Sequence, residues 1–192
     1  MGITKRFLKK HAEKIDKKYW YIIPFFCTFS NAALGFASVL YALDDYYTSA
    51  AICLLLACFM DACDGRLARA LGAESMLGEE LDSLCDAISF CFAPAVLLFS
   101  WLFHQASPLF LIVLLAYLLS GLYRLAKFNI MENKQDYFIG LPTPIAAGIV
   151  AQMILYQQWF NFLFLQNVIF VAAVVLLIAY LMIAPIKIPS FK

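Results

Sequence analysis

Six long apolar segments, separated by short polar stretches, make up most of the chain after residue 24. They cover residues 25–43, 47–71, 80–103, 108–130, 141–158 and 163–184. A helix needs about 20 residues to cross a hydrocarbon core that is about 30 Å thick, and each segment is close to that length. The pattern predicts an all-α integral membrane protein with six transmembrane helices, in one domain over residues 21–192.

The first 20 residues follow a different pattern, because basic and apolar residues alternate there. An amphipathic basic helix on the membrane surface has this composition. A basic tail that only sets the membrane topology is the alternative. Half of the chain's basic residues lie in this segment, namely Lys5, Arg6, Lys9, Lys10, Lys14, Lys17 and Lys18.

The composition agrees with a membrane protein and excludes several other classes. Hydrophobic residues make up 64% of the chain and charged residues 14%, with a mean hydropathy of +0.82. Soluble domains average about 45–50% apolar and about 25% charged residues. A net charge of +1 gives no reason to expect nucleic acid as a partner. The six cysteines lie in or beside apolar runs, which favours buried free thiols over a disulfide framework or a zinc site.

The remaining basic residues predict the orientation in the membrane. They lie in the last turns of the second and fourth segments, just after the fourth, or near the C-terminus, and positive residues favour the cytoplasmic side. We therefore expect a multi-pass protein of the cytoplasmic membrane, or an equivalent one, with both termini and the functional site on the cytoplasmic side. These residues are Arg66, Arg69, Arg124, Lys127, Lys134, Lys187 and Lys192.

Four aspartates lie at the facing ends of the second and third segments. Each costs about 2.5–3.5 kcal/mol at the centre of an isolated membrane helix. Asp61 and Asp64 are three residues apart, and Asp82 and Asp86 are four apart, so each pair shares a helix face. A helical hairpin that turns near Ser75 would bring Asp64 level with Asp86 and gather all four carboxylates.

Carboxylates gathered in this way repel one another unless cations lie among them. Hard divalent cations with oxygen ligands meet that need, and two of them about 4 Å apart form a clamp for displacement at phosphorus. Gly65 and Ala68 leave room for a ligand on the acidic face, and Arg69 adds a cation suited to phosphate. Helices packed through small residues, with the acids facing cytosolic water, are the alternative.

The residues between positions 61 and 86 resemble the full signature of the CDP-alcohol phosphatidyltransferase family. The signature reads Asp61-x2-Asp64-Gly65-x2-Ala68-Arg69-x8-Gly78-x3-Asp82-x3-Asp86. The resemblance implies a six-helix membrane fold with a cytosol-facing site, usually in a homodimer. It also implies transfer of a phosphatidyl group from a CDP-linked lipid to an alcohol, with release of CMP and with Mg²⁺ or Mn²⁺ as cofactor.

The same resemblance implies roles for individual residues. Asp61, Asp64 and Asp82 are expected to be metal ligands, and Asp86 is expected to be the general base and to touch a metal. The expected nucleotide and pyrophosphate contacts are Asp61, Gly65, Ala68, Arg69 and Gly78. Asn31 shares a face of the first segment with Gly35 and Ser38, where it either contacts the nucleotide or a phosphate or makes only interhelical hydrogen bonds.

The end of the fourth segment and the start of the fifth resemble the phosphatidylserine synthase branch of this family. There Arg124-Leu-Ala-Lys127-Phe-Asn precedes Gly140-Leu-Pro-Thr-Pro. The branch implies CDP-diacylglycerol as donor and L-serine as acceptor, with Arg124 and Lys127 binding the serine carboxylate. The alternative for both cations is simple anchoring at a helix end.

Two other functions stay open. The same chemistry could use glycerol 3-phosphate, an inositol phosphate or choline, although a phosphorylated acceptor calls for more basic residues than this chain offers beside the acids. A divalent-cation transporter could also use clustered carboxylates, but transporters tend to place such sites near the midplane between repeats.

Overall fold

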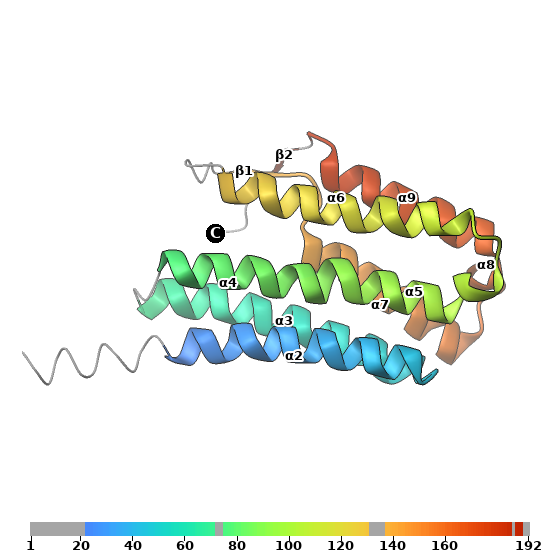
Figure 1. Cartoon of the computed structure of the whole chain (residues 1–192), viewed down its shortest axis with the longest axis horizontal. Coiled ribbons are helices and arrows are strands. Elements are labelled where there is room, and N and C mark those ends of the chain that lie inside the picture. Colours follow the sequence, from blue (N-terminus) through green and yellow to red (C-terminus); the bar gives the residue numbers. More distant parts are fainter. Residues whose placement is uncertain (1–21, 72–74, 131–136, 186, 190–192) are drawn as a thin grey trace, which may run out of the picture.

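The computed structural model describes residues 22–71, 75–130, 137–185 and 187–189, and these residues form a bundle of helices (Figure 1). The expected surface helix at 1–20 lies outside them. The helices are α2 (Ile22–Leu43), α3 (Tyr47–Leu71), α4 (Met76–Asp86), η1 (Ala87–Phe92), α5 (Ala93–Trp101), η2 (Phe103–Gln105), α6 (Phe110–Ile130), α7 (Thr143–Phe160), α8 (Leu163–Gln166) and α9 (Val168–Ile183).

Each predicted apolar segment corresponds to helix, with two differences. The sixth segment is broken, because Asn167 caps a new helix: its Oδ1 accepts hydrogen bonds from the backbone N–H groups of Ile169 and Phe170. The all-α prediction also missed a short antiparallel pairing of β1 (Tyr137–Ile139) with β2 (Lys187–Pro189).

Three of the described helical stretches are long and apolar enough to cross a membrane: Phe25–Leu43, Met76–Trp101 and Phe110–Ile130. The second of these is one continuous helix made of α4, η1 and α5. Among the other helices, α3 carries the charged residues Asp61, Asp64 and Arg66, and α9 has only 16 residues.

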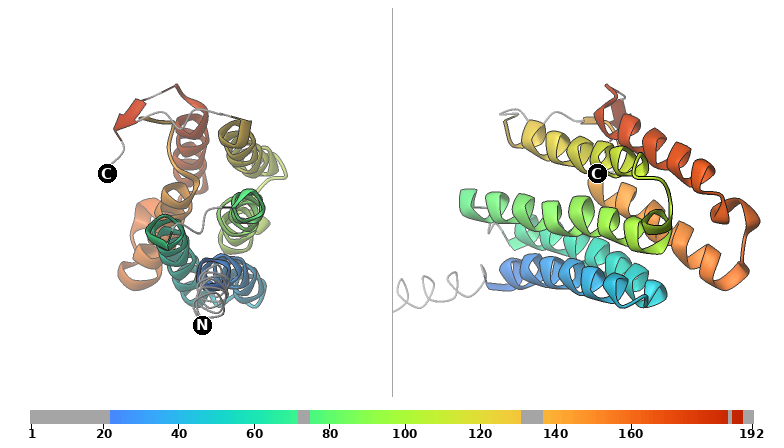
Figure 2. Two further views of the ribbon diagram at one scale, coloured as in Figure 1. Left: turned by 90° about the vertical axis from the view of Figure 1, so that its left-hand side faces the viewer. Right: turned by 45° about the vertical axis from the view of Figure 1, so that its right-hand side comes forward.

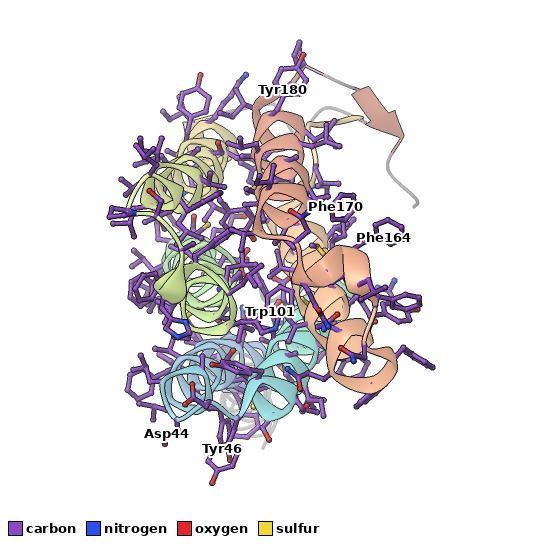
Figure 3. All side chains as sticks on the ribbon, turned by 90° about the vertical axis from the view of Figure 1, so that its right-hand side faces the viewer. Asp44, Tyr46, Trp101, Phe164, Phe170 and Tyr180 are labelled. Carbon is purple, nitrogen blue, oxygen red and sulfur yellow. The ribbon has the colours of Figure 1, made fainter. Side chains whose placement is uncertain are left out.

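The helices run side by side, so that the bundle has two distinct ends (Figure 2). At one end, left in Figure 1, α3 leads toward α4 and α6 finishes. At the other end lie the α2–α3 turn and the short helix α8; Figure 3 looks onto this end, with Asp44 and Tyr46 at one edge and Phe164 and Phe170 at another. α3 packs against both α2 and α7, and α6 packs against α9.

The buried core is apolar, and so is much of the outer surface. Leu54, Leu97 and Ile154 are fully buried in one large cluster. Phe36 and Leu177 nevertheless expose 59% and 55% of their surface, in keeping with helices that face lipid. All six cysteines fall in the described segments and are free, as predicted, but only Cys85 and Cys91 are buried and the other four are partly exposed.

Candidate active site

Three of the four aspartates form a compact cluster of carboxylates. Asp61, Asp64 and Asp82 each bring one oxygen to within 4.8 Å of the others. Asp86 lies beside them: it interacts electrostatically with all three and is within hydrogen-bonding reach of Asp61. Asp64 and Asp86 are buried, and the other two are half-buried. Four negative side chains from α3 and α4 therefore share one small region, as the sequence predicted.

The hairpin turns close to the predicted position. Helix α3 ends at Leu71, and α4 begins at Met76. Ser75 caps α4, because its side chain accepts a hydrogen bond of 3.1 Å from the backbone N–H of Gly78. The level of Asp64 relative to Asp86 stays a prediction.

Helix α2 supplies two polar side chains to the carboxylates. The Thr28 hydroxyl donates a hydrogen bond of 3.0 Å to Oδ2 of Asp64, and Nδ2 of Asn31 donates one of 3.1 Å to Oδ1 of Asp86. Asn31 is fully buried. Its Oδ1 has no hydrogen-bond partner among the described residues. Because one of its amide hydrogens is bound to Asp86, Asn31 is placed to orient that carboxylate.

The helix changes its winding immediately after Asp86. Residues Ala87–Phe92 form η1, a π-helical segment, and such segments inside α-helices often occur at functional sites. Helices α6 and α2 both contact this segment. The Tyr117 hydroxyl of α6 donates to the carbonyl of Phe90 at 3.0 Å, and the Ser89 hydroxyl donates to the carbonyl of Asn31 at 3.0 Å. At Gly35 of α2, any Cβ would collide with Ser89.

Helix α6 places a cation on another side of Asp86. Arg124 is partly buried, interacts electrostatically with Asp86 and Asp61, and donates from Nη1 to Oγ1 of Thr143 at 3.4 Å. Its Nε is buried and has no partner in the part of the chain that the structure describes. Lys127, expected beside it, is exposed near the end of α6.

Of the expected nucleotide contacts, the structure describes the surroundings of Gly65 and Gly78 but not the side chains of Ala68 and Arg69. Gly65 is exposed, and a Cβ built there would meet no atom of the described residues within 4 Å. At Gly78 a Cβ would lie 3.0 Å from Oγ of Ser75, so local capping already accounts for a glycine there. Ala68 and Arg69 lie in α3, but their side chains are outside the described part.

Sequence reasoning missed Thr28, Tyr117 and Thr143 as parts of this site. Thr28 lies one turn before Asn31 on the same face, so its position on the first segment was a usable signal. Tyr117 and Thr143 contact the site through long-range packing, which no local spacing indicates.

Comparisons with known proteins bear on this site. The model of the family described as CDP-alcohol phosphatidyltransferase matches residues 21–180. A protein of Helicobacter pylori (strain ATCC 700392 / 26695) named CDP-diacylglycerol--serine O-phosphatidyltransferase is 32% identical over 174 residues, which are 90% of this chain and 73% of the relative. A protein of Bacillus subtilis (strain 168) with the same name is 34% identical over 170 residues, 88% of this chain and 91% of the relative. Archaetidylserine synthase of Methanothermobacter thermautotrophicus is 33% identical over 150 residues, 73% of this chain and 61% of the relative.

Proposed function

This chain belongs to the CDP-alcohol phosphatidyltransferase family, and from that premise we propose that it makes phosphatidylserine. The phosphatidyl group of CDP-diacylglycerol passes to the hydroxyl of L-serine, and CMP leaves. The family makes the chain a transferase of phospholipid biosynthesis, and the names of the relatives support serine as acceptor. The observation that carries the proposal is the cluster of Asp61, Asp64 and Asp82, beside which Arg124 interacts with Asp86 and Asp61.

The carboxylate cluster fits divalent cations. Its donors are all carboxylate oxygens, the type that Mg²⁺ and Mn²⁺ prefer. Among the described residues, Oδ1 of Asp82 is buried without a hydrogen-bond partner, as a ligand atom would be. We propose that the cluster holds two cations. Asp61, Asp64 and Asp82 are assigned as their ligands, and Asp86 also touches one of the cations. When bound, these cations would neutralise the pyrophosphate charge and favour the departure of CMP.

Asp86 is the proposed general base. Asn31 binds one of its carboxylate oxygens, which fixes the side chain and leaves the second oxygen for a substrate proton. As the serine hydroxyl oxygen bonds to the phosphorus of the phosphatidyl group, its proton passes to Asp86. The bond between that phosphorus and the bridging oxygen breaks, and the electron pair leaves with CMP.

Arg124 is the proposed partner of the serine carboxylate. A carboxylate that approaches four aspartates is repelled by them, and a fixed guanidinium offsets this repulsion with two parallel hydrogen bonds. Nε of Arg124 is buried without a partner in the described segments, so one donor is available. Lys127 was expected to share this role, but its exposure makes it the weaker candidate.

The nucleotide is proposed to lie against α3 near Gly65. The open space at Gly65 allows a ligand to approach the backbone closely, which is a common reason for glycine at such positions. Arg69 and Ala68 follow on the same helix and complete the proposed pyrophosphate contacts, with Gly78 from α4. Asn31 stays a proposed nucleotide contact, because only one of its two amide hydrogens is bound to Asp86 and the other can donate to a phosphate.

We propose six membrane spans, formed by α2, α3, α4 to α5, α6, α7 and α9, with the carboxylates toward the cytoplasm. The distribution of basic residues supports this orientation. Cysteine labelling of single exposed positions at each end of the bundle would test it. A homodimer is proposed from the family resemblance alone, and cross-linking in native membranes would test that.

Release of CMP in detergent tests the function. CDP-diacylglycerol is offered with L-serine, glycerol 3-phosphate, an inositol phosphate or choline, with Asp86→Asn as the matched control. We expect CMP release that depends on serine and formation of phosphatidylserine. Preference for another alcohol would keep the chemistry and refute the acceptor, whereas no CMP release with any alcohol would contradict the proposed function.

A further inference from the structure

We infer that Thr143 is a positioning residue that sets the orientation of Arg124 and thereby the selectivity for an acceptor with a carboxylate. This inference rests on the proposed function, in which Arg124 binds serine. It starts from the hydrogen bond of 3.4 Å between Nη1 of Arg124 and Oγ1 of Thr143. Thr143 is fully buried, so its hydroxyl cannot exchange this partner for bulk water.

The segment before Thr143 is built rigidly. Gly140 has a φ of +75°, and a Cβ there would collide with the carbonyl of Met182 in α9, so only glycine fits without strain. The N–H of Leu141 donates to the carbonyl of Leu181 at 2.9 Å. Pro142 is the N-cap residue of α7 and fixes its own φ.

The segment after Thr143 is also held. Pro144 lies in the first turn of α7, and its carbonyl accepts a hydrogen bond of 3.3 Å from the thiol of Cys58 in α3. The Gly-Leu-Pro-Thr-Pro sequence thus docks on α9 on one side and on α3 on the other. Its threonine has little freedom to move away from Arg124.

The consequence for Arg124 follows from the geometry of a guanidinium. Thr143 occupies a donor of one terminal nitrogen, and Nε has no partner among the described residues. Nε and the second terminal nitrogen form an edge that matches the two oxygens of a carboxylate. Arg124 also interacts electrostatically with Asp86 and Asp61, which would attract its head group into a direct ion pair. The Thr143 hydroxyl opposes that shift and keeps the edge available.

Two variants separate this role from simple packing. Thr143→Ser keeps the hydroxyl, and Thr143→Val keeps the size but removes the hydroxyl. We expect Thr143→Val to raise the KM for serine roughly 3- to 10-fold, as for loss of one hydrogen bond, with the KM for CDP-diacylglycerol unchanged. Thr143→Ser should stay near wild type. If Thr143→Val behaves like Thr143→Ser, or raises the KM of the lipid instead, the inference is overturned.

Serinol, which replaces the carboxylate of serine with a neutral hydroxymethyl group, gives an independent readout. Its KM should be the same in wild type and Thr143→Val, because no carboxylate is present to be oriented. In an Arg124→Ala background the valine substitution should have no further effect on the KM for serine. Additive effects would assign Thr143 a role apart from Arg124.

If Thr143→Val does not fold, Thr143→Ala in the same comparison replaces it. A wild-type protein whose CMP release does not depend on serine would refute the proposed function. A serine-dependent enzyme whose KM for serine is unaffected by Thr143→Val would refute this inference and leave the proposed function standing.

Discussion

Asp86 interacts with two regions of opposite charge that are built in different ways. On one side, α3 and α4 supply carboxylates at spacings of three and four residues, so each helix alone determines which acids share a face. On the other side, Arg124 depends on Thr143, whose position depends on contacts of α7 with α9 and α3. The carboxylate side is local in sequence, and the arginine side is assembled by tertiary packing.

The difference indicates that the two regions have separate roles. The carboxylate side holds the charged groups that every transfer from a CDP-linked lipid would need. In the proposed function the arginine side selects the acceptor, and it can change by substitution in α6 or α7 without disturbing the proposed metal ligands. Variants on the first side should therefore stop all transfer, and variants on the second should change the response to serine alone.

Asp86→Asn should have the largest effect. Removal of a general base costs typically 10²–10⁴ in rate, while the amide keeps the size of the side chain and leaves the three other carboxylates in place. We expect kcat to fall by that range with binding of CDP-diacylglycerol largely kept, as measured by single-turnover CMP release and by equilibrium binding. Retention of more than half of the wild-type turnover would show that another group takes the proton.

Alanine at Asp61, Asp64 or Asp82 should reduce both turnover and metal binding. Chelator should abolish wild-type activity, and Mg²⁺ or Mn²⁺ should restore it. Thermal unfolding gives a readout apart from activity, because a bound cation stabilises the folded state by an amount that increases with its affinity. The wild type should gain thermal stability when Mg²⁺ is added, and the three variants should gain less. Full activity in chelator at saturating substrate would contradict the assignment of the cluster to metal.

The sequence was most informative where the function is local. The apolar pattern predicted the helices to within a few residues, since burial in lipid demands long apolar runs. The four aspartates were predicted because charge in such runs is costly. The third segment was expected to begin at residue 80, whereas α4 begins at Met76, because capping by Ser75 places its start and apolar length gives no signal for a cap.

The sequence was least informative where packing between distant segments decides. The role of Asn31 was left open, because a hydrogen bond to Asp86 across 55 positions has no local signature. The π-helical segment after Asp86 was not predicted either, since its partners Tyr117 and Gly35 lie in other helices.

Arg124→Ala tests the arginine side directly. We expect the KM for serine to rise by about 10-fold or more, because a hydrogen bond to a charged group contributes about 1.5–3 kcal/mol. The KM for CDP-diacylglycerol should change little. Arg124→Lys should recover part of the loss, because an ammonium keeps the charge but cannot form the two parallel hydrogen bonds of a guanidinium. Lys127→Ala is the matched control on the same helix and should have a smaller effect. An unchanged serine KM with weakened lipid binding would make Arg124 a pyrophosphate contact.

Gly65→Ala should have the smallest effect, and a second glycine provides its control. A Cβ at Gly65 or at Gly148 would meet nothing within 4 Å in the segments that the structure describes, and both residues lie in helices. Alanine favours a helix over glycine by about 0.5–1 kcal/mol, so neither variant should lose thermal stability.

If the nucleotide lies against α3, the added methyl group at Gly65 should raise the KM for CDP-diacylglycerol by roughly 5-fold, as mild overpacking does. The KM for serine should stay unchanged, and Gly148→Ala should match wild type in both constants. Equal behaviour of the two variants would mean that no ligand approaches the backbone at Gly65, and the nucleotide would then have to lie nearer α4.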